Sequence, residues 1–341
     1  MADATFAATL QRQFDIIWPH AEAAVNRRVS APLRVLAASA GDVPPCARAG
    51  REPVLFVHLA GMMRSFADTT DHLLSFLDGS ASCWLVHLHT LEFAEQREPW
   101  WCAFDHRGHA QRDDRALCLA RAAAGANTSV VPGLPRAIRP FRDAPHGGIS
   151  YVVASRAYEP SLVDNKVLQG FAAVGALARA TLSHHGLAAR RSDFVLHSRP
   201  DILYASTIDF ARLARLGRRA PPLLLLLRHS ARPGAEGIGW NDPSDITWLA
   251  TRGALERICP AGAPCWGARG AEELRRGFGS CGHAYVALFI HAASSVGIAS
   301  FFLAVGWRIS LLRMHGDGPP RRGYNGEAPP HPPRDVATQA D

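Results

Sequence analysis

The chain has 341 residues, of which 48% are hydrophobic and 20% are charged. This composition excludes a wholly disordered chain, and the length allows one large α/β domain with a substantial core. The formal net charge is +7, but the 37 basic residues, of which only Lys166 is a lysine, are spread along the chain. Because they form no basic face interleaved with aromatic residues, the sequence predicts no nucleic-acid partner.

Residues 1–50 predict a helical N-terminal extension followed by a linker. Residues 1–22 have the apolar spacing of an amphipathic helix, with an interruption near Pro19. Acidic residues prevent a continuous apolar core, so this segment is not a secretory signal peptide. The next stretch is rich in alanine, proline and arginine, which is typical of a linker. We therefore expect a soluble protein of the cytoplasm or the Golgi lumen.

Residues 54–90 have the pattern of a βαβ unit. VLFVHLAG at 54–61 and CWLVHLHT at 83–90 are short apolar runs, and the segment between them has helical spacing from Phe66 to Leu77. Two strands joined by a helix predict neighbouring parallel strands with a right-handed crossover.

The turn after the first strand contains Gly61, Arg64 and Ser65. A glycine allows a tight turn close to a ligand, while an arginine and a helix N-terminus both favour an anion such as a diphosphate. We therefore take these three as candidate substrate-binding residues. The alternative is an ordinary α/β turn with a solvated arginine.

The α/β pattern resumes after an irregular stretch at 97–148, which includes one helix near 113–124. A helical pattern runs from Val163 to His185 and ends at Gly186, and apolar runs at 193–198, 223–228 and 245–250 predict strands. Strands that alternate with helices predict an α/β, Rossmann-like fold, in which helices flank a mostly parallel sheet.

The strand at 193–198 leads into Arg199, Pro200 and Asp201. Open α/β sheets bind ligands at the carboxyl ends of their strands, and an aspartate there can hold a divalent cation such as Mn²⁺ or Mg²⁺. Asp201 is thus a candidate metal ligand, and Arg199 a candidate substrate-binding residue that offsets phosphate charge. The alternative is a structural pair between Arg199 and Asp201. In either case Asp201 is expected beside Gly61 and Arg64.

Two further groups of polar residues accompany predicted strands. His87 and His89 face the same side of their strand, and core or surface histidines are the favoured interpretation over a metal pair. His89 is retained as a candidate substrate-binding residue. Asp242 and Asp245 precede the strand at 245–250 and are candidate catalytic bases, with a turn cap as the alternative.

The C-terminal part contains one segment long enough to span a bilayer, residues 284–307. Ser294, Ser295 and Gly297 interrupt it and favour a buried helix that turns into a strand, with a membrane anchor as the alternative. The Pro/Gly-rich residues 315–341 predict a disordered tail. Of the seven cysteines, Cys259 and Cys265 either close a small loop in an oxidising compartment or remain thiols.

No nucleophile elbow, Walker loop, dinucleotide glycine fingerprint or HExxH signature appears, which argues against the enzyme classes that they mark. Four segments instead resemble a family of glycosyltransferase-like proteins with a GT-A-type nucleotide-diphospho-sugar fold: VLFVHLAGMMRSF, CWLVHLHT, VDNKVLQGFAAVGALARATLSHHG and DFVLHSRPDILY. NDPSDITWLATRGALERI and AYVALFIHAASSVGIASFFLAVGWRISLLR are similar to later elements of that family. The likeness covers residues 54–314.

The resemblance implies a GT-A-like domain at 51–314 that transfers a sugar from a nucleotide-diphospho-sugar donor to an unknown acceptor, which is a glycan, a protein or a small molecule. It implies a divalent cation at Asp201, a diphosphate at Arg64 and Arg199, and a base at Asp242 or Asp245. Only the last acid of the family's Asp-x-Asp motif is present, at Asp201. A catalytically silent fold that acts as a binding or scaffold protein is therefore the alternative function.

Overall fold

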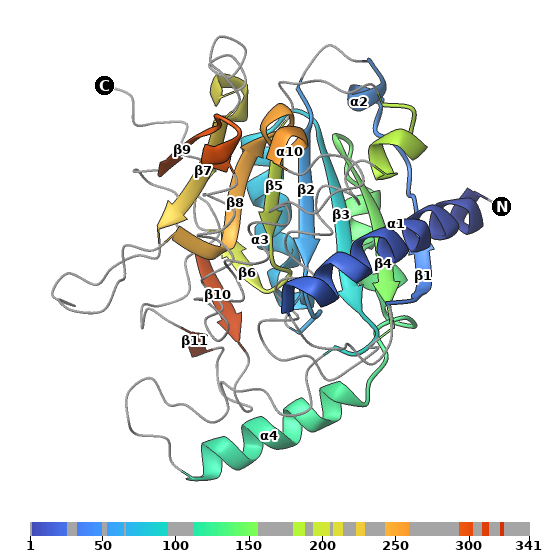
Figure 1. Cartoon of the computed structure of the whole chain (residues 1–341). Coiled ribbons are helices and arrows are strands. Elements are labelled where there is room, and N and C mark those ends of the chain that lie inside the picture. Colours follow the sequence, from blue (N-terminus) through green and yellow to red (C-terminus); the bar gives the residue numbers. More distant parts are fainter. Residues whose placement is uncertain are drawn as a thin grey trace, which may run out of the picture.

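The fold is built around one mixed β-sheet with helices on both faces (Figure 1). The computed structural model describes residues 2–25, 33–49, 53–64, 66–94, 112–155, 180–187, 194–204, 207–213, 223–228, 243–258, 293–302, 309–313 and 321–323. Within these ranges, eight strands have the order β1-β4-β3-β2-β5-β8-β7-β9. They are β1 (Val35–Ser39), β2 (Leu55–Ala60), β3 (Trp84–Leu91), β4 (Gly147–Ala154), β5 (Phe194–Ser198), β7 (Leu223–Arg228), β8 (Pro243–Thr251) and β9 (Ala299–Phe302).

The centre of the sheet consists of four parallel strands, β4, β3, β2 and β5. Every residue of β2 and β3 is buried, because helices cover both faces of these strands. Helix α3 (Phe66–Ser80) connects β2 to β3, as the sequence predicted for residues 54–90. The apolar runs predicted at 193–198, 223–228 and 245–250 are confirmed as β5, β7 and β8.

The flanks of the sheet include antiparallel pairs. β1 lies antiparallel to β4, and β8 lies antiparallel to both β5 and β7, whereas β9 runs parallel to β7. The sheet is thus largely parallel only at its centre. The sequence did not indicate these antiparallel pairs, because an apolar run predicts a buried strand without predicting its direction. The direction of β8 matters for the site, since its first residues lie at the edge where β5 ends.

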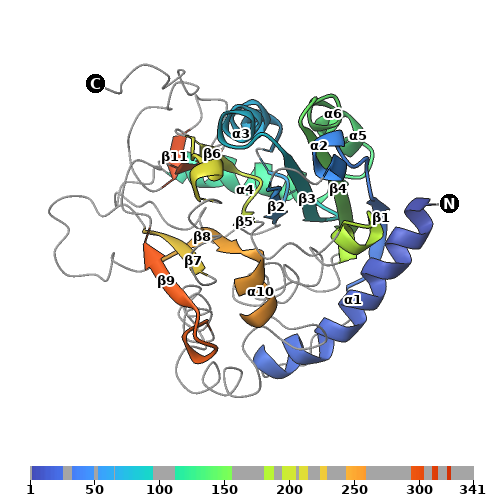
Figure 2. The ribbon, with the colours of Figure 1, turned by 90° about the horizontal axis from the view of Figure 1, so that it is seen from above.

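The two faces of the sheet carry different helices (Figure 2). Helices α3, α5 (Leu134–Ala137) and α6 (Arg139–Arg142) cover one face, and α1 (Ala2–Val25) and α10 (Arg252–Ile258) cover the other. On the first face, side chains of β2, β3 and β5 join those of α3, α5 and α6 in one large apolar cluster. On the second face, a smaller cluster joins Phe6, Leu10 and Phe14 of α1 to residues of β3 and β4. We call these the α3 face and the α1 face.

The N-terminal residues differ from the prediction in two respects. Helix α1 runs from Ala2 to Val25 without the expected interruption near Pro19, because a proline removes one backbone hydrogen bond and can leave the helix continuous. The expected linker supplies the edge strand β1 and the short helix α2 (Pro45–Ala49), so it belongs to the folded body. The small residues of β1 concealed this strand in the sequence.

A disulfide joins Cys46 of α2 to Cys83, the residue before β3. Their Cα atoms are 5.7 Å apart and the two cysteines are 37 residues apart in sequence. The bond ties the N-terminal segment to the sheet and restricts the unfolded chain. The sequence did not indicate this pairing, and Cys259 and Cys265 lie outside the described residues.

The described part of the segment at 284–307 has the helix-to-strand form that the sequence favoured. A helical turn at 293–295 ends at Gly297, whose φ of 71° is left-handed, and β9 follows. Ile298 N–H closes this turn by donating to Ala293 O at 2.8 Å. The described residues include no helix that is both long and apolar enough to cross a membrane.

Two further predicted segments are described in part. The helix expected at 163–185 is helical at 180–184 and ends at Gly186, with a φ of 65°. The helix near 113–124 is α4 (Arg112–Ala126). In the expected tail, β11 (Arg321–Gly323) pairs with β10 (Ile309–Arg313), which pairs with β6 (Ile202–Tyr204) in a second, antiparallel sheet. The expected disorder therefore does not hold for the three residues of β11, and the rest of 315–341 lies outside the described residues.

Candidate functional site

Two loops meet at the carboxyl ends of β2 and β5. These strands are parallel neighbours, and Leu59 near the end of β2 pairs with Ser198 at the end of β5. The residues that follow both strands therefore leave the sheet at the same edge. Parallel sheets bind their ligands at this edge.

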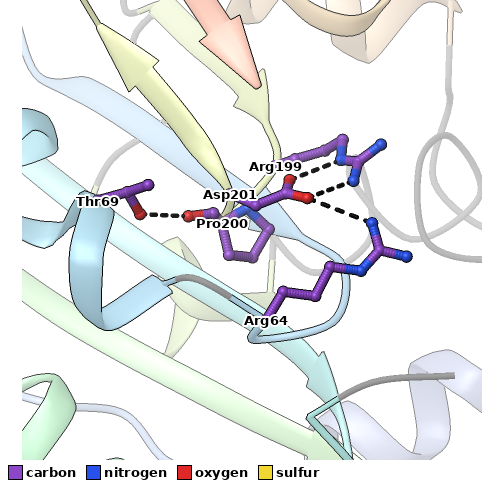
Figure 3. A network of polar contacts seen from close by, with 5 residues as sticks. All are labelled: Arg64, Thr69, Arg199, Pro200 and Asp201. Atoms are coloured by element: carbon purple, nitrogen blue, oxygen red, sulfur yellow. Dashed lines mark hydrogen bonds and ion pairs between the residues drawn. The ribbon is translucent and has the colours of Figure 1, made fainter. Parts of the chain in front are cut away.

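The two loops bring Arg64 and Arg199 onto the carboxylate of Asp201 (Figure 3). Arg199 donates from Nε to Oδ1 at 2.8 Å and from Nη2 to Oδ2 at 2.5 Å, and Arg64 donates from Nη1 to Oδ2 at 3.2 Å. The side chain of Asp201 is 1% exposed, while those of Arg64 and Arg199 are 14% and 21% exposed. Two guanidinium groups thus converge on one carboxylate, and solvent reaches part of each guanidinium side chain.

The backbone before α3 is unusual at two residues. Gly61 has a φ of 145° and Arg64 a φ of 33°, both in the range that favours glycine. Backbone N–H groups hold the turn, since Gly61 donates to His89 O at 3.1 Å and Arg64 donates to Ala94 O at 3.0 Å. A left-handed conformation costs a residue other than glycine about 1–2 kcal/mol. The turn therefore holds Arg64 in a strained conformation that points its side chain at Asp201.

Thr69 of α3 holds the loop that follows β5. Its hydroxyl donates to Pro200 O at 2.7 Å, as Figure 3 shows. The loop after β5 is thereby attached to the helix that follows the loop after β2. Sequence reasoning did not identify Thr69, because a threonine inside a helix carries no signal of a contact 131 residues away.

A buried group of hydroxyls lies at the end of β5. Tyr204 donates to Ser198 Oγ at 2.6 Å, and Ser198 Oγ lies 3.0 Å from Thr247 Oγ1 of β8. Burial raises the pKa of Tyr204 well above its usual value, so it remains a neutral donor. These hydrogen bonds connect β5, β6 and β8 around the loop that carries Asp201.

As they stand, the described residues do not fit the divalent cation that the resemblance implies. Both carboxylate oxygens of Asp201 accept from arginines, and two guanidinium groups would repel a second cation. In the described part of the chain, no three His, Cys, Asp or Glu side chains are grouped so that they could hold a metal ion. Asp201 adopts the alternative expected from the sequence, a pair with Arg199.

The remaining predicted site residues are not all at this cluster. Asp245 lies in β8, near the edge where β5 ends, whereas Ser65 and Asp242 lie outside the described residues. His89 accepts from Gly61 through its backbone carbonyl, but its ring packs against Phe14 of α1, with ring centroids 5.4 Å apart. The structure thus brings Gly61, Arg64, Arg199 and Asp201 together and directs the ring of His89 to the α1 face.

A row of polar and aromatic side chains crosses five strands on the α1 face. Paired positions on β4, β3, β2, β5 and β8 carry Ser150, His87, His58, His197 and Trp248. All five residues are buried. The four rings among them stack, with centroids 5.8 Å apart for His58 and His87, 5.4 Å for His58 and His197, and 5.1 Å for His197 and Trp248. We call the three histidines of this row, together with the neighbouring His89, the histidine row.

Burial keeps three members of the histidine row, His58, His87 and His89, neutral. It lowers the pKa of His87 to about 3 and that of His89 to about 4, and it holds the pKa of His58 well below its usual value. His58 and His197 face each other with their Nδ1 atoms 3.2 Å apart, and His87 Nδ1 lies 2.8 Å from Ser150 Oγ. Nε2 of His58, Nε2 of His87 and both ring nitrogens of His89 have no hydrogen-bond partner among the described residues. The core interpretation of His87 and His89 is correct, but their pairing with His58 was missed.

Neither protein-family models nor curated proteins match this sequence.

Proposed function

We propose that the chain binds a nucleotide-diphospho-sugar donor at the loops after β2 and β5 and transfers its sugar to an acceptor. The convergence of Arg64 and Arg199 at the carboxyl ends of two parallel neighbours supports this proposal. A diphosphate is an acceptor of charge-assisted hydrogen bonds, and exposed guanidinium groups of fixed orientation suit it. Two partly exposed guanidinium groups at one edge of the sheet favour an anionic ligand.

In the proposed reaction, an acceptor hydroxyl oxygen attacks the anomeric carbon of the donor sugar. The bond from that carbon to the diphosphate oxygen breaks, and the nucleoside diphosphate leaves with the bonding electrons. Arg64 and Arg199 stabilise the negative charge that develops on this leaving group. Asp201 orients the two guanidinium groups, and Asp245 is the proposed base that takes the proton of the acceptor hydroxyl.

Donor binding tests the role of the two arginines. Calorimetric titration with a panel of nucleotide-diphospho-sugars in EDTA is expected to identify a donor whose affinity falls about tenfold or more in Arg64→Ala, a loss of about 1.4 kcal/mol. Arg199→Lys should also weaken binding, because a lysine cannot make the same bidentate contact. Arg142→Ala, on the exposed surface of α6, is the matched control and should bind as the unsubstituted protein does. A donor that binds Arg64→Ala and Arg199→Lys at full strength contradicts the proposal.

A second titration distinguishes the arginines from a cation. Because both oxygens of Asp201 are engaged with arginines, affinity in Mn²⁺ should equal that in EDTA. Binding that requires Mn²⁺ would restore the cation role for Asp201.

A catalytically silent binding protein is the second candidate. The observation that favours it is the buried carboxylate of Asp201, which pairs with two arginines. A carboxylate paired in this way does not act as an acidic metal ligand. Release of nucleoside diphosphate from a bound donor, lost in Asp245→Asn, would identify an enzyme. Binding that leaves the donor intact, with any acceptor class, would identify the silent fold.

A further inference from the structure

Helix α1 covers the histidine row with apolar side chains. Its Phe6 ring packs edge-on against His87, with ring centroids 6.4 Å apart, and its Phe14 ring lies 5.4 Å from His89. The rings of Phe6 and Phe14 are 0% and 3% exposed, so the contact excludes water from this part of the row. An imidazole in such a contact must be neutral, because a charge there would lose its hydration without gaining a partner.

Among the described residues, the groups that lower the pKa of His58 and His87 in addition to burial are other histidines, and burial lowers the pKa of His89. The carboxylates of α1 are engaged elsewhere, since Asp3 accepts from the backbone of Ala40 and Asp15 from Gln11. Among residues whose side chains the structure describes, the titratable or charged groups on the helices packed around the row are Asp3, Arg12 and Asp15 of α1, His184 and His185 of the segment 180–187, and Arg252, Glu256 and Arg257 of α10.

Among the side chains that the structure describes, those of α1 belong to a smaller apolar cluster than those of α3. Gln11 accepts from Val35 N–H at 2.8 Å and donates to Leu33 O at 3.0 Å, and Asp3 accepts from Ala40 N–H at 3.1 Å. These contacts bind α1 to the edge of the sheet, and the apolar cluster beneath it is smaller than the one beneath α3. An element with fewer buried apolar contacts opens at a lower free energy than the rest of the fold.

We propose that α1 is an acid-released cover: when the histidine row takes up protons, α1 leaves the sheet while the α3 face remains folded. Release exposes His87 and His89 to water, where each binds a proton at its ordinary pKa. Protons therefore favour the open form by mass action, and the opening constant of α1 rises by about tenfold per pH unit for each imidazole exposed. This inference does not rest on the proposed donor site, because it is argued from the contacts of α1 with His87 and His89 and not from Asp201.

Hydrogen exchange of the full chain, corrected for the intrinsic exchange rate, tests the inference between pH 6.0 and pH 5.0. This range lies above the pH at which ordinary carboxylates take up protons, so Asp3 and Asp15 do not contribute. We expect the opening constant of α1 to rise about sixtyfold across it, about eightfold for each of His87 and His89. Peptides of α3 should remain protected over the same range. Equal loss of protection in α1 and α3, or no loss in α1, would overturn the inference.

A variant pair separates this mechanism from simple destabilisation. His89→Leu removes a titrating ring with two unpartnered nitrogens from an apolar site, so the variant is expected to fold. It should reduce the rise for α1 to about eightfold, whatever it does to stability. His146→Leu, at an exposed position just before β4, is the matched control and should retain the rise of about sixtyfold. A rise of about sixtyfold that persists in His89→Leu contradicts the inference. The same experiments make it distinguishable from a failure of the proposed function, since no donor is used.

Discussion

The two faces of the sheet use the same strands in different ways. On the α3 face, alternate residues of β2 and β3 are leucine, valine and tryptophan, and they pack against the phenylalanines of α3. The polar atom of Trp84 is satisfied there, because its indole N–H donates to Asp78 Oδ1 at 3.0 Å. On the α1 face, the intervening positions carry His58, His87 and His89, several of whose ring nitrogens have no partner among the described residues.

This difference makes the stability of the α1 face, but not that of the apolar cluster on the α3 face, depend on pH. Apolar burial stabilises the α3 face, and the free energy of that burial does not depend on protonation. The α1 face is buried just as completely in the region of β2 and β3, but its stability depends on the neutral form of imidazoles. The alternation of side chains along a strand allows one sheet to have both properties.

The largest expected effect comes from removing a buried phenylalanine of the α3 face, compared with removing one of the α1 face. Phe76 of α3 is fully buried and stacks on Tyr204 with centroids 4.3 Å apart, so Phe76→Ala should lower the free energy of unfolding by about 3–5 kcal/mol. Phe14→Ala should lower it less, because the loss cannot exceed what the docking of α1 contributes. Urea denaturation measures both, and hydrogen exchange should show that Phe14→Ala exposes α1 alone. Equal losses in the two variants would mean that both faces unfold as one unit.

The next effect is the pH dependence of the α1 face. The pKa values of His58, His87 and His89 are lowered in the folded protein, so below pH 6.5 the unfolded chain binds more protons than the folded one. Stability is therefore complete above pH 6.5 and falls with pH until the folded-state pKa values of about 4 for His89 and about 3 for His87 are reached. Between pH 7.5 and pH 6.0, three such groups cost about 2 kcal/mol together.

Urea denaturation at the two pH values measures this loss. His58→Gln, if it folds, should reduce the pH dependence by about a third and thereby assign the effect to the row. A free energy of unfolding that is the same at pH 7.5 and pH 6.0 would show that the row is hydrated in the folded protein.

Much of the sheet could be predicted from the sequence. The buried strands β2, β3, β5 and β7 are short apolar runs, and such runs have few alternatives in a chain that alternates strands with helices. β1 could not be predicted, because its alanines and serine resemble a linker. The antiparallel direction of β8 depends on long-range pairing with β5 and leaves no mark on its own residues.

The site was predicted in part for a similar reason. Arg64 and Asp201 follow apolar strands, so their meeting at one sheet edge could be expected from the parallel order alone. The engagement of both Asp201 oxygens by arginines depends on side-chain geometry, which the motif Arg199-Pro200-Asp201 does not specify. The row was missed because His58 and His197 are single polar residues within apolar runs, and register across strands cannot be read from either run.

The smallest expected effect is a difference in stability between two variants of Arg64, in the turn after β2. Arg64→Ala and Arg64→Gly both remove the guanidinium group from Asp201, so they should weaken donor binding equally. They should differ in stability, because the φ of 33° at this position strains alanine and not glycine. We expect Arg64→Gly to unfold at a free energy about 1 kcal/mol higher than Arg64→Ala, measured in the same urea series. The glycine also gives the unfolded chain more freedom, which reduces the difference and makes 1 kcal/mol an upper value. If Arg64→Ala is the more stable of the two variants, the turn relaxes when the side chain is removed. The strain at Arg64 is then a consequence of its ion pair with Asp201. The backbone hydrogen bonds from Gly61 to His89 and from Arg64 to Ala94 would not be its cause.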